Sequence, residues 1–221
     1  MKWLAMIPLR GGSRAIPKKN IKELGGKPLF AWSLEAAIES GCFDKILVAT
    51  DNAEIATVVE RLFEEDKVTI FHRSPESATD EASTEVVMAE VLASESFDVM
   101  ATIQATSPLT RPSDFKKAQE LFLGENLDSL YTGVLTKSFF WTIDNKPLNY
   151  DFRSRPRRQD HSGTIQENGA FYFTSRKVLS TYKNRLGGFI GHYLMPYETL
   201  IEIDEPSDFK VLEDLIRKQI R

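Results

Sequence analysis

The residues best suited to chemistry lie in a short basic bend, "IPLRGGSRAIPKKN", which spans residues 7–20. Two adjacent glycines let the backbone approach a ligand closely and turn its amides toward it. The surrounding cations can neutralise a polyanion, and the planar fork of arginine suits phosphate oxygens. The bend is therefore a candidate site for a nucleoside triphosphate. Its polar and glycine residues are Arg10, Gly11, Gly12, Ser13, Arg14, Lys18, Lys19 and Asn20.

A solvated basic turn is the alternative interpretation, and for an isolated motif of this kind it is the commoner one. The bend is not a Walker loop, since the G-x-x-x-x-G-K-[ST] spacing is absent, and it does not match G-x-G-x-x-G. It follows the continuous apolar run "WLAMI", which is typical of a strand buried on both faces. We therefore expect the bend at the carboxyl end of a central strand, where open α/β sheets bind ligands.

Two further segments offer groups for a sugar. In "IQATSPLTR", Gln104 and two hydroxyls follow a predicted strand, so they reach the same sheet edge; for this segment taken alone, a capped turn leading to the next helix is the favoured interpretation. In "RSRPRRQD", four arginines between Arg153 and Arg158 can grip a carboxylate in bidentate fashion. They can also form a surface arm that pairs with acidic residues of a partner subunit. Both interpretations hold if the arm crosses into a neighbour's site.

The segment "LIEIDEPSDF" carries a pair of carboxylates, Glu202 and Asp204. Residues two apart on an extended strand share one face, and paired carboxylates at a strand end can hold Mg²⁺ beside substrate phosphates. The alternative is that Asp204 caps the last helix, a task that Ser207 or Asp208 can share. The three histidines are scattered without metal-ligand spacing.

Composition restricts the class of protein. The chain has 221 residues, 42% of them hydrophobic and 27% charged, which suits a single globular domain spanning 1–221. A net charge of -4 argues against a nucleic-acid partner. The single cysteine, Cys42, excludes an internal disulfide and suits a reducing compartment. The first apolar run is too short for a signal peptide or a membrane span, so we expect a cytoplasmic enzyme without a membrane partner.

The elements that position these groups alternate between strand and helix. Short loops join them, so a parallel sheet with right-handed crossovers is the simplest topology. Asp51 stands three residues before Glu54, a spacing typical of a capping box at a helix start. Residues 136–164 show no clear period and are expected to leave the sheet. The expected strands are 3–7, 45–50, 68–71, 98–105, 128–135 and 169–175, and the expected helices are 28–41, 51–65, 84–95, 112–123 and 207–221.

Eight segments occur together in one order, and that order resembles the CMP-sialic acid synthetases, also called acylneuraminate cytidylyltransferases. The resemblance runs from Ile7 to about Asp208. The segments are "IPLRGGSRAIPKKNI", "LVATD", "FHRSPE", "DEAST", "IQATSPL", "RPRRQD", "ENGAFYF" and "IEID".

The resemblance implies an α/β fold like that of the nucleotide-diphospho-sugar transferases, with three layers, a mixed, mostly parallel central sheet and a protruding dimerisation element, for which 136–164 is the candidate. It implies a nucleotidyltransferase reaction as well. The anomeric hydroxyl of a nine-carbon 2-keto acid sugar, such as sialic acid or KDN, attacks the α-phosphate of CTP. CMP-sugar and pyrophosphate are formed, Mg²⁺ is required, and the protein is expected to be a homodimer.

The resemblance also assigns roles to residues of this chain. Arg10, Lys19 and Asp204 are the implied catalytic residues, and Asp204 and Glu202 are the implied metal ligands. Arg158 and Gln159 belong to the arm that reaches the sugar carboxylate. The remaining implied nucleotide-binding residues are Gly11, Gly12, Ser13, Arg14, Asn20, Arg73, Ala82, Ser83 and Thr84, and the remaining sugar-binding residues are Gln104, Asn168 and Gly169.

Three positions depart from the family pattern. Arg14 stands where lysine is usual, Ala15 where glycine is usual, and Glu202 where the family has the first aspartate of "DID". Enzymes that activate legionaminic, pseudaminic or KDO acids remain alternatives. A non-catalytic nucleotide-binding regulator of the same fold is an alternative of another class, against which the retained carboxylates and cations argue.

Overall fold

The computed structural model describes residues 1–13, 15–64 and 66–219, with side chains as far as Arg217. Within this part of the chain, seven strands form the main sheet in the order β5-β4-β1-β6-β8-β7-β9. These strands are β1 (Trp3–Pro8), β4 (Lys45–Thr50), β5 (Val68–His72), β6 (Val99–Ile103), β7 (Ser129–Thr136), β8 (Thr164–Ser175) and β9 (Ile190–Leu194).

The predicted alternation of strands and helices is confirmed, but the simple parallel topology is wrong at one strand. Strand β8 pairs antiparallel with both β6 and β7, whereas the other pairings in the sheet are parallel. The chain returns directly from the excursion after β7 into β8, so no crossover helix precedes this strand. The structure therefore confirms the mixed, mostly parallel sheet that the resemblance implies.

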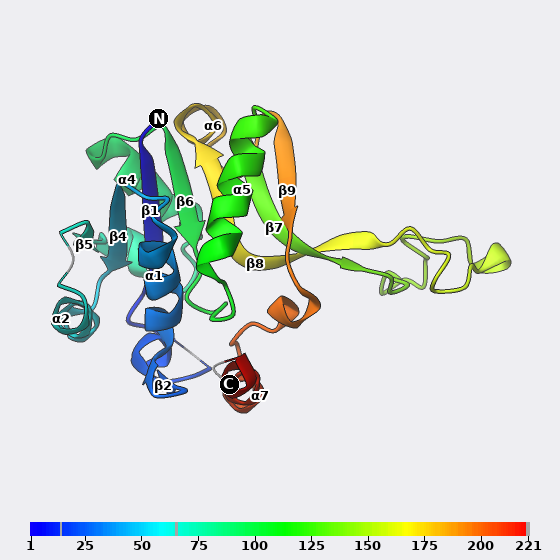
Figure 1. Ribbon diagram of the computed structural model, residues 1–221, viewed down its shortest axis with the longest axis horizontal. Coiled ribbons are helices and arrows are strands. Elements are labelled where there is room, and N and C mark those ends of the chain that lie inside the picture. Colours follow the sequence, from blue (N-terminus) through cyan, green and yellow to red (C-terminus); the bar gives the residue numbers. More distant parts are fainter. Residues whose placement is uncertain (14, 65, 220–221) are drawn as a thin grey trace.

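Helices cover both faces of the sheet (Figure 1). The core on one face includes side chains of α1, α2 and α5, and the core on the other includes side chains of α4 and α6. A third, smaller core packs α7 against the β2–β3 hairpin and the start of α1. The α-helices are α1 (Leu29–Ser40), α2 (Ala53–Leu62), α3 (Pro75–Ala78), α4 (Thr84–Ser94), α5 (Pro112–Gly124), α6 (Arg176–Tyr182) and α7 (Pro206–Gln219), and the hairpin strands are β2 (Glu23–Leu24) and β3 (Lys27–Pro28).

Local sequence explains where helices α1 and α2 begin and end. Helix α1 stops at Gly41, which has φ 66°, a left-handed conformation that glycine adopts at low cost. Helix α2 begins one residue later than the sequence suggested. Its N-cap is Asn52, whose side chain accepts a hydrogen bond from the amide of Ile55, and the expected cap, Asp51, is used elsewhere.

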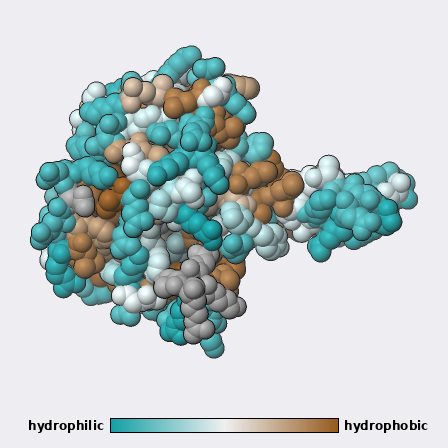
Figure 2. Space-filling model, in the orientation of Figure 1, coloured by the Kyte–Doolittle hydropathy of each residue, from teal (hydrophilic) through white to brown (hydrophobic). Residues whose placement is uncertain are grey.

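Residues 136–164 leave the sheet as predicted, because β7 ends at Thr136 and β8 begins at Thr164. The segment projects far from the body of the molecule (Figure 1) and is largely hydrophilic at its tip, with an apolar patch at its base (Figure 2). We call residues 137–163 the arm. In the described part of the chain, no helix is both long and apolar enough to cross a membrane.

The aromatic core beside β8 gives a test of the packing. Phe173 is fully buried and its ring contacts those of Trp3, Phe122 and Phe43. We expect Phe173→Ala to lower the free energy of unfolding by about 3–5 kcal/mol, because the cavity would be walled by rigid rings. Urea unfolding followed by tryptophan fluorescence measures the loss. Phe173→Leu should lose clearly less, and equal losses in both variants would contradict the packing.

Candidate active site

A cavity of about 280 Å³ opens at the carboxyl ends of β1 and β6. Most of the residues to which sequence reasoning assigned the nucleotide lie around it, although they come from three separate segments of the chain. The cavity is lined by Pro8, Arg10, Gly12, Ser13, Lys19, Asn20, Arg73, Asp80, Ala82, Thr84, Val87, Gln104 and Thr106. Arg14 lies outside the described residues, and Ser83 stands between two lining residues as the N-cap of α4.

Hydrogen bonds from outside the glycine bend fix its backbone. The amide of Gly11 donates to Asp51 Oδ1 over 2.9 Å, and Asn20 Nδ2 donates to the carbonyl of Arg10 over 2.9 Å. A Cβ at Gly11 would lie 2.8 Å from Cβ of Asn52, closer than real atoms approach. Gly11 is therefore required by the contact with the start of α2, and Asn20 closes the bend from its other end.

Two arginines bring positive charge to the cavity. Arg10 Nη1 donates to Asp80 Oδ1 over 2.9 Å, with both side chains about one-third exposed. Arg73 donates to the carbonyl of Ser77, and its burial lowers its pKa below the ordinary value for arginine. Sequence reasoning missed Asp80, although it belongs to the quoted segment that contains Ala82. The carboxylate orients the Arg10 fork at the rim of the cavity.

Lys19 connects the glycine bend to the carboxylate segment. Its Nζ donates to the carbonyl of Ile203 over 2.9 Å and lies 3.5 Å from Asp204 Oδ1. The Lys19 side chain is only 17% exposed, whereas that of Asp204 is 77% exposed. Lys19 also lines the cavity, whereas Asp204 and Glu202 are not among its lining residues, so the carboxylate segment meets the cavity through Lys19. The two segments therefore meet at Lys19, as expected, and their sharing of one nucleotide and its magnesium stays a prediction.

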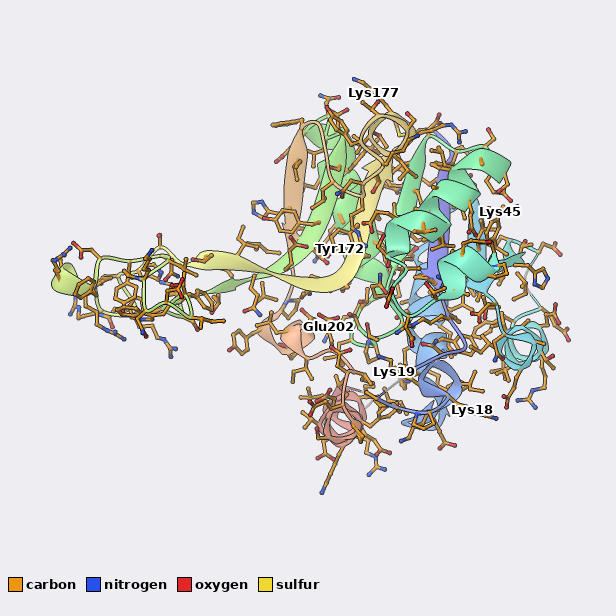
Figure 3. The ribbon with its side chains drawn as sticks, turned by 180° about the vertical axis from the view of Figure 1, so that it is seen from behind. Lys18, Lys19, Lys45, Tyr172, Lys177 and Glu202 are labelled. Carbon is orange, nitrogen blue, oxygen red and sulfur yellow. The ribbon has the colours of Figure 1, made fainter. Side chains whose placement is uncertain are left out.

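Glu202 is the more buried carboxylate of the pair. Burial, followed by the charge of Asp204, raises the pKa of Glu202 to about 7, while Lys19 acts to lower it. Its carboxylate lies against Gly169, which has φ 63°; a Cβ there would stand 3.0 Å from Glu202 Oε2. Figure 3 shows Glu202 between Tyr172 and Lys19. Gly169 thus allows the carboxylate to approach the backbone of β8.

The carboxylate pair suits a hard cation. Two carboxylates that lie close together destabilise each other's charge unless a counter-charge is present. Mg²⁺ prefers oxygen ligands and usually keeps several waters or phosphate oxygens in its coordination shell. No cluster of three or more histidine, cysteine or acidic residues that could hold a metal occurs among the described residues. Glu202 and Asp204 would therefore supply only part of a coordination shell, as substrate-assisted magnesium sites do.

The residues assigned to the sugar take three different environments. Gln104 lines the cavity, and its backbone amide donates to the carbonyl of Ala170, next to Gly169. Asn168 is buried, and its Nδ2 donates to Thr199 Oγ1 over 2.8 Å. The side chain of Asn168 therefore ties β8 to the segment that leads to Glu202. Only Gln104 of these side chains faces the cavity described above.

Arg158 and Gln159 lie on the exposed surface of the arm. The arm points away from the cavity of its own chain (Figure 1), so the structure does not bring these two residues to the site within one chain. The arm nevertheless has a defined shape. Lys137 Nζ donates to the carbonyl of Gln159 over 2.9 Å, and Arg157 pairs with Asp160.

Fold and site together define an α/β protein with a cavity at the carboxyl edge of its sheet, lined in large part by polar and cationic residues. The family profile described as Cytidylyltransferase matches residues 4–220, and the chain belongs to the cytidylyltransferase family. It is 36% identical over 220 residues to N-acylneuraminate cytidylyltransferase A of Danio rerio, an alignment that covers 96% of this chain and 50% of the relative. The chain thus spans about half the length of that relative.

A second relative matches over its whole length. Pseudaminic acid cytidylyltransferase of Campylobacter jejuni is 29% identical over 230 residues, with 98% of this chain and 97% of the relative covered. Among solved structures, a CMP-2-keto-3-deoxy-manno-octonic acid synthetase complexed with CTP superposes with a TM-score of 0.73 at 18% identity, covering 99% of this chain and all of the other. This likeness establishes the fold. The resemblance drawn from the motifs is confirmed by these relatives.

The two glycines of the bend provide a matched test of its geometry. We expect Gly11→Ala to lower the free energy of unfolding by about 1–3 kcal/mol, because the new Cβ overlaps Asn52 and forces the bend to shift. Gly12→Ala should change it by less than about 0.5 kcal/mol, since the nearest atom, Asp80 Oδ1, lies at an ordinary 3.8 Å. Urea midpoints compare the two variants, and equal losses would show that the bend is not held as described.

Proposed function

We propose that this protein transfers CMP from CTP to the anomeric hydroxyl of a nine-carbon 2-keto acid sugar, sialic acid, KDN or a close relative, and releases pyrophosphate. The observation that carries the proposal is the contact of Lys19 with Ile203 and Asp204, which joins the cationic loop that lines the cavity to the segment that carries the carboxylate pair. The relatives named above support the choice of CTP and of an acidic sugar.

The triphosphate would lie on the glycine bend. Arg10, Lys19 and the bend amides would hold its β- and γ-phosphates, and Ser13 and Asn20 would add hydrogen bonds. A protein catalyses phosphoryl transfer chiefly by positioning the reactants and stabilising charge. Negative charge increases on the departing pyrophosphate during the reaction. Arg14 would add a further cation to the same phosphates.

The cytidine would occupy the part of the cavity next to α4. Arg73, Ala82, Ser83 and Thr84 would surround the base and the ribose, and three of them line the cavity. The backbone and hydroxyl groups at the start of α4 provide donors and acceptors at fixed positions. Burial lowers the pKa of Arg73, so this guanidinium lies on a partly desolvated side of the cavity.

Glu202 and Asp204 would hold Mg²⁺. When bound, the ion would neutralise phosphate charge and lower the pKa of the attacking hydroxyl. Asp204 is the more exposed of the two and would face the phosphates, whereas Glu202, held against Gly169, would stand nearer to the acceptor. The exchange of aspartate for glutamate at position 202 keeps the carboxylate on a side chain that is one methylene longer.

The sugar would lie between Gln104 and the carboxylate pair. Gln104 would bind its hydroxyls, and Asn168 and Gly169 would shape the floor on which it rests. Arg158 and Gln159 would bind its carboxylate from the arm of a second copy of the chain, because the arm points away from the cavity of its own chain. The protein would therefore act as a homodimer. A cytoplasmic location remains a prediction that rests on the reducing compartment suggested by Cys42.

Pseudaminic acid is the second candidate acceptor, and the full-length match to a pseudaminic acid cytidylyltransferase favours it. A pyrophosphate-release assay with CTP and a panel of acids, N-acetylneuraminic, KDN, legionaminic, pseudaminic and KDO, separates the candidates. Turnover of the first two fits the proposal. Absence of turnover with every acid would favour a non-catalytic nucleotide-binding regulator.

Loss of the Asp204 carboxylate tests the metal assignment. We expect Asp204→Ala to lower kcat by at least about a hundred-fold, because charge stabilisation at the phosphates is lost, while CTP binding in calorimetry changes little. Glu205→Ala, which removes an exposed neighbouring carboxylate, is the control and should keep normal turnover. Wild-type turnover of Asp204→Ala in the presence of Mg²⁺ would remove Asp204 from the mechanism.

Arg158 tests the role of the arm. We expect Arg158→Ala to raise the KM for the sugar by about ten-fold or more and to leave the KM for CTP within about two-fold, because a bidentate charge pair with the sugar carboxylate is lost. Arg153→Ala, another exposed arginine of the arm, serves as control. An effect confined to CTP contradicts the assignment. Mixing Arg158→Ala with an Asp204→Ala subunit should restore partial turnover if the arm serves the partner's site.

A further inference from the structure

Four polar side chains from distant parts of the chain form a continuous series of contacts next to the cavity. Arg185 Nε donates to Glu85 Oε1 over 2.6 Å, and the Arg185 guanidinium lies 4.9 Å from the centre of the Tyr172 ring. Tyr172 Oη donates to Glu167 Oε2 over 2.8 Å. We call Glu85, Arg185, Tyr172 and Glu167 the β8–α4 network. The reaction proposed above assigns none of these residues a role.

Glu85 and Arg185, packed beside Tyr172, are too buried to be an ordinary surface ion pair, whereas Glu167 is exposed. The Glu85 and Arg185 side chains are each 21% exposed, and Tyr172 is 7% exposed. Burial acts to raise the pKa of Glu85, yet the hydrogen bond and charge of Arg185 outweigh it and hold that pKa below its ordinary value. Burying such a pair costs desolvation energy that apolar side chains of similar size avoid, so its presence points to a positional role.

The network lies between the two ends of the proposed site. Glu85 follows Thr84, which lines the nucleotide cavity at the start of α4. Tyr172 stands opposite Thr102 in the β6–β8 pairing, two residues before Gln104, which also lines the cavity. The charge of Glu202 acts on the Tyr172 hydroxyl, and Figure 3 shows Glu202 between Tyr172 and Lys19, so Glu202 lies near this end of the network.

The charge of this region determines which part of an acceptor it can face. Three carboxylates and one guanidinium lie along this network: Glu85 pairs with Arg185, Glu167 accepts a hydrogen bond from Tyr172, and Glu202 acts on Tyr172 through its charge. A region with excess negative charge repels an acid group and accepts hydrogen bonds from hydroxyls. The hydroxyl-bearing side of an acidic sugar therefore suits this region, and its carboxylate suits the arginines of the arm.

We propose that Arg185 is a positioning residue for the acceptor. Arg185 is held by Glu85 and fixes the Tyr172 ring. Tyr172 and Glu167 together form the wall that the sugar hydroxyls face, so Arg185 orients that wall. The inference rests on the proposed function and extends it. Because Glu85 belongs to the first turn of α4, the network also links this wall to the helix that borders the nucleotide. Arg185 itself touches neither substrate.

Steady-state kinetics with both substrates varied tests the proposal, using the acid that the wild-type protein turns over fastest in the panel. We expect Arg185→Met to lower kcat/KM for the acid by about ten-fold or more, since a displaced wall misplaces the acceptor, and to leave the KM for CTP within about two-fold. Arg185→Lys keeps the charge but loses the planar surface over Tyr172, so it should recover part of the loss.

Lys45→Met is the matched control. Lys45 forms an ion pair with Glu95 of similar burial, at 31% and 20% exposure, and strand β4 is separated from β8 by β1 and β6. This variant should leave both substrates unaffected even if it lowers the urea midpoint. Should Arg185→Met fail to fold, Glu85→Gln removes the ion pair with little change of shape and is measured in the same way.

Each other outcome overturns the inference. An acid kcat/KM within about two-fold of wild type in Arg185→Met and Glu85→Gln shows that the network does not position the acceptor. If the KM for CTP rises as much as kcat/KM for the acid falls, or if Lys45→Met lowers kcat/KM for the acid to the same extent, the effect is a general one of stability. If the wild-type protein turns over no acid in the panel, the proposed function fails and the inference fails with it. The absence of wild-type turnover distinguishes this result from a failure of the inference alone.

Discussion

The site depends on the ammonium group of Lys19. A largely buried lysine must find partners for its charge and its protons, and here it finds the carbonyl of Ile203 and the carboxylate of Asp204. Those partners lie 184 and 185 residues away in sequence. The contact brings the loop after the first strand against the segment before the last helix. With Ile16 and Ile203 in the same small core, the polar contact has an apolar support directly beneath it. Neither segment has a strand partner in the main sheet at this point, so their approach relies on these contacts.

The charges around the cavity are separated by sign. Cations gather on the bend after β1 and on Arg73, whereas carboxylates gather on the side of β8 and the approach to α7. Carboxylates also stand on the cationic side, where Asp80 pairs with Arg10, Glu54 pairs with Lys18, and Asp51 accepts a hydrogen bond from the Gly11 amide. This separation explains the perturbed pKa of Glu202, because burial and a neighbouring carboxylate act together and Lys19 offsets them only in part. A ligand that carries phosphates together with a divalent cation matches both halves, which is the chemistry proposed for the reaction.

Sequence predicts those features that depend on neighbouring residues and misses those that depend on distant ones. The buried runs of β1 and β4 and the periodic helices were predictable because burial on both faces or on one stripe leaves a local pattern. Strand β9 was missed, since it is a short edge strand whose residues alternate between half-buried and exposed. The exchange of Asp51 for Asn52 as helix cap was also invisible, because Asp51 instead accepts the amide of Gly11, forty residues away. Glu85 and Arg185 are one hundred residues apart, and no spacing rule connects them.

The arm raises the question of how a segment with little contact to the body can present Arg158 at a fixed place. Its own contacts provide the answer. Asn149 accepts a hydrogen bond from the amide of Phe140 and donates to Ser138 and Thr164, which staples the two sides of the arm together at its base. Rings of Phe139 and Tyr150 pack against each other, and the Arg155 guanidinium lies over both. A segment stiffened in this way loses less conformational entropy on docking than a flexible loop would. An arginine at its surface can therefore serve a second copy of the chain without the cost of ordering the arm first, which favours a site shared between two subunits over one that a mobile loop completes.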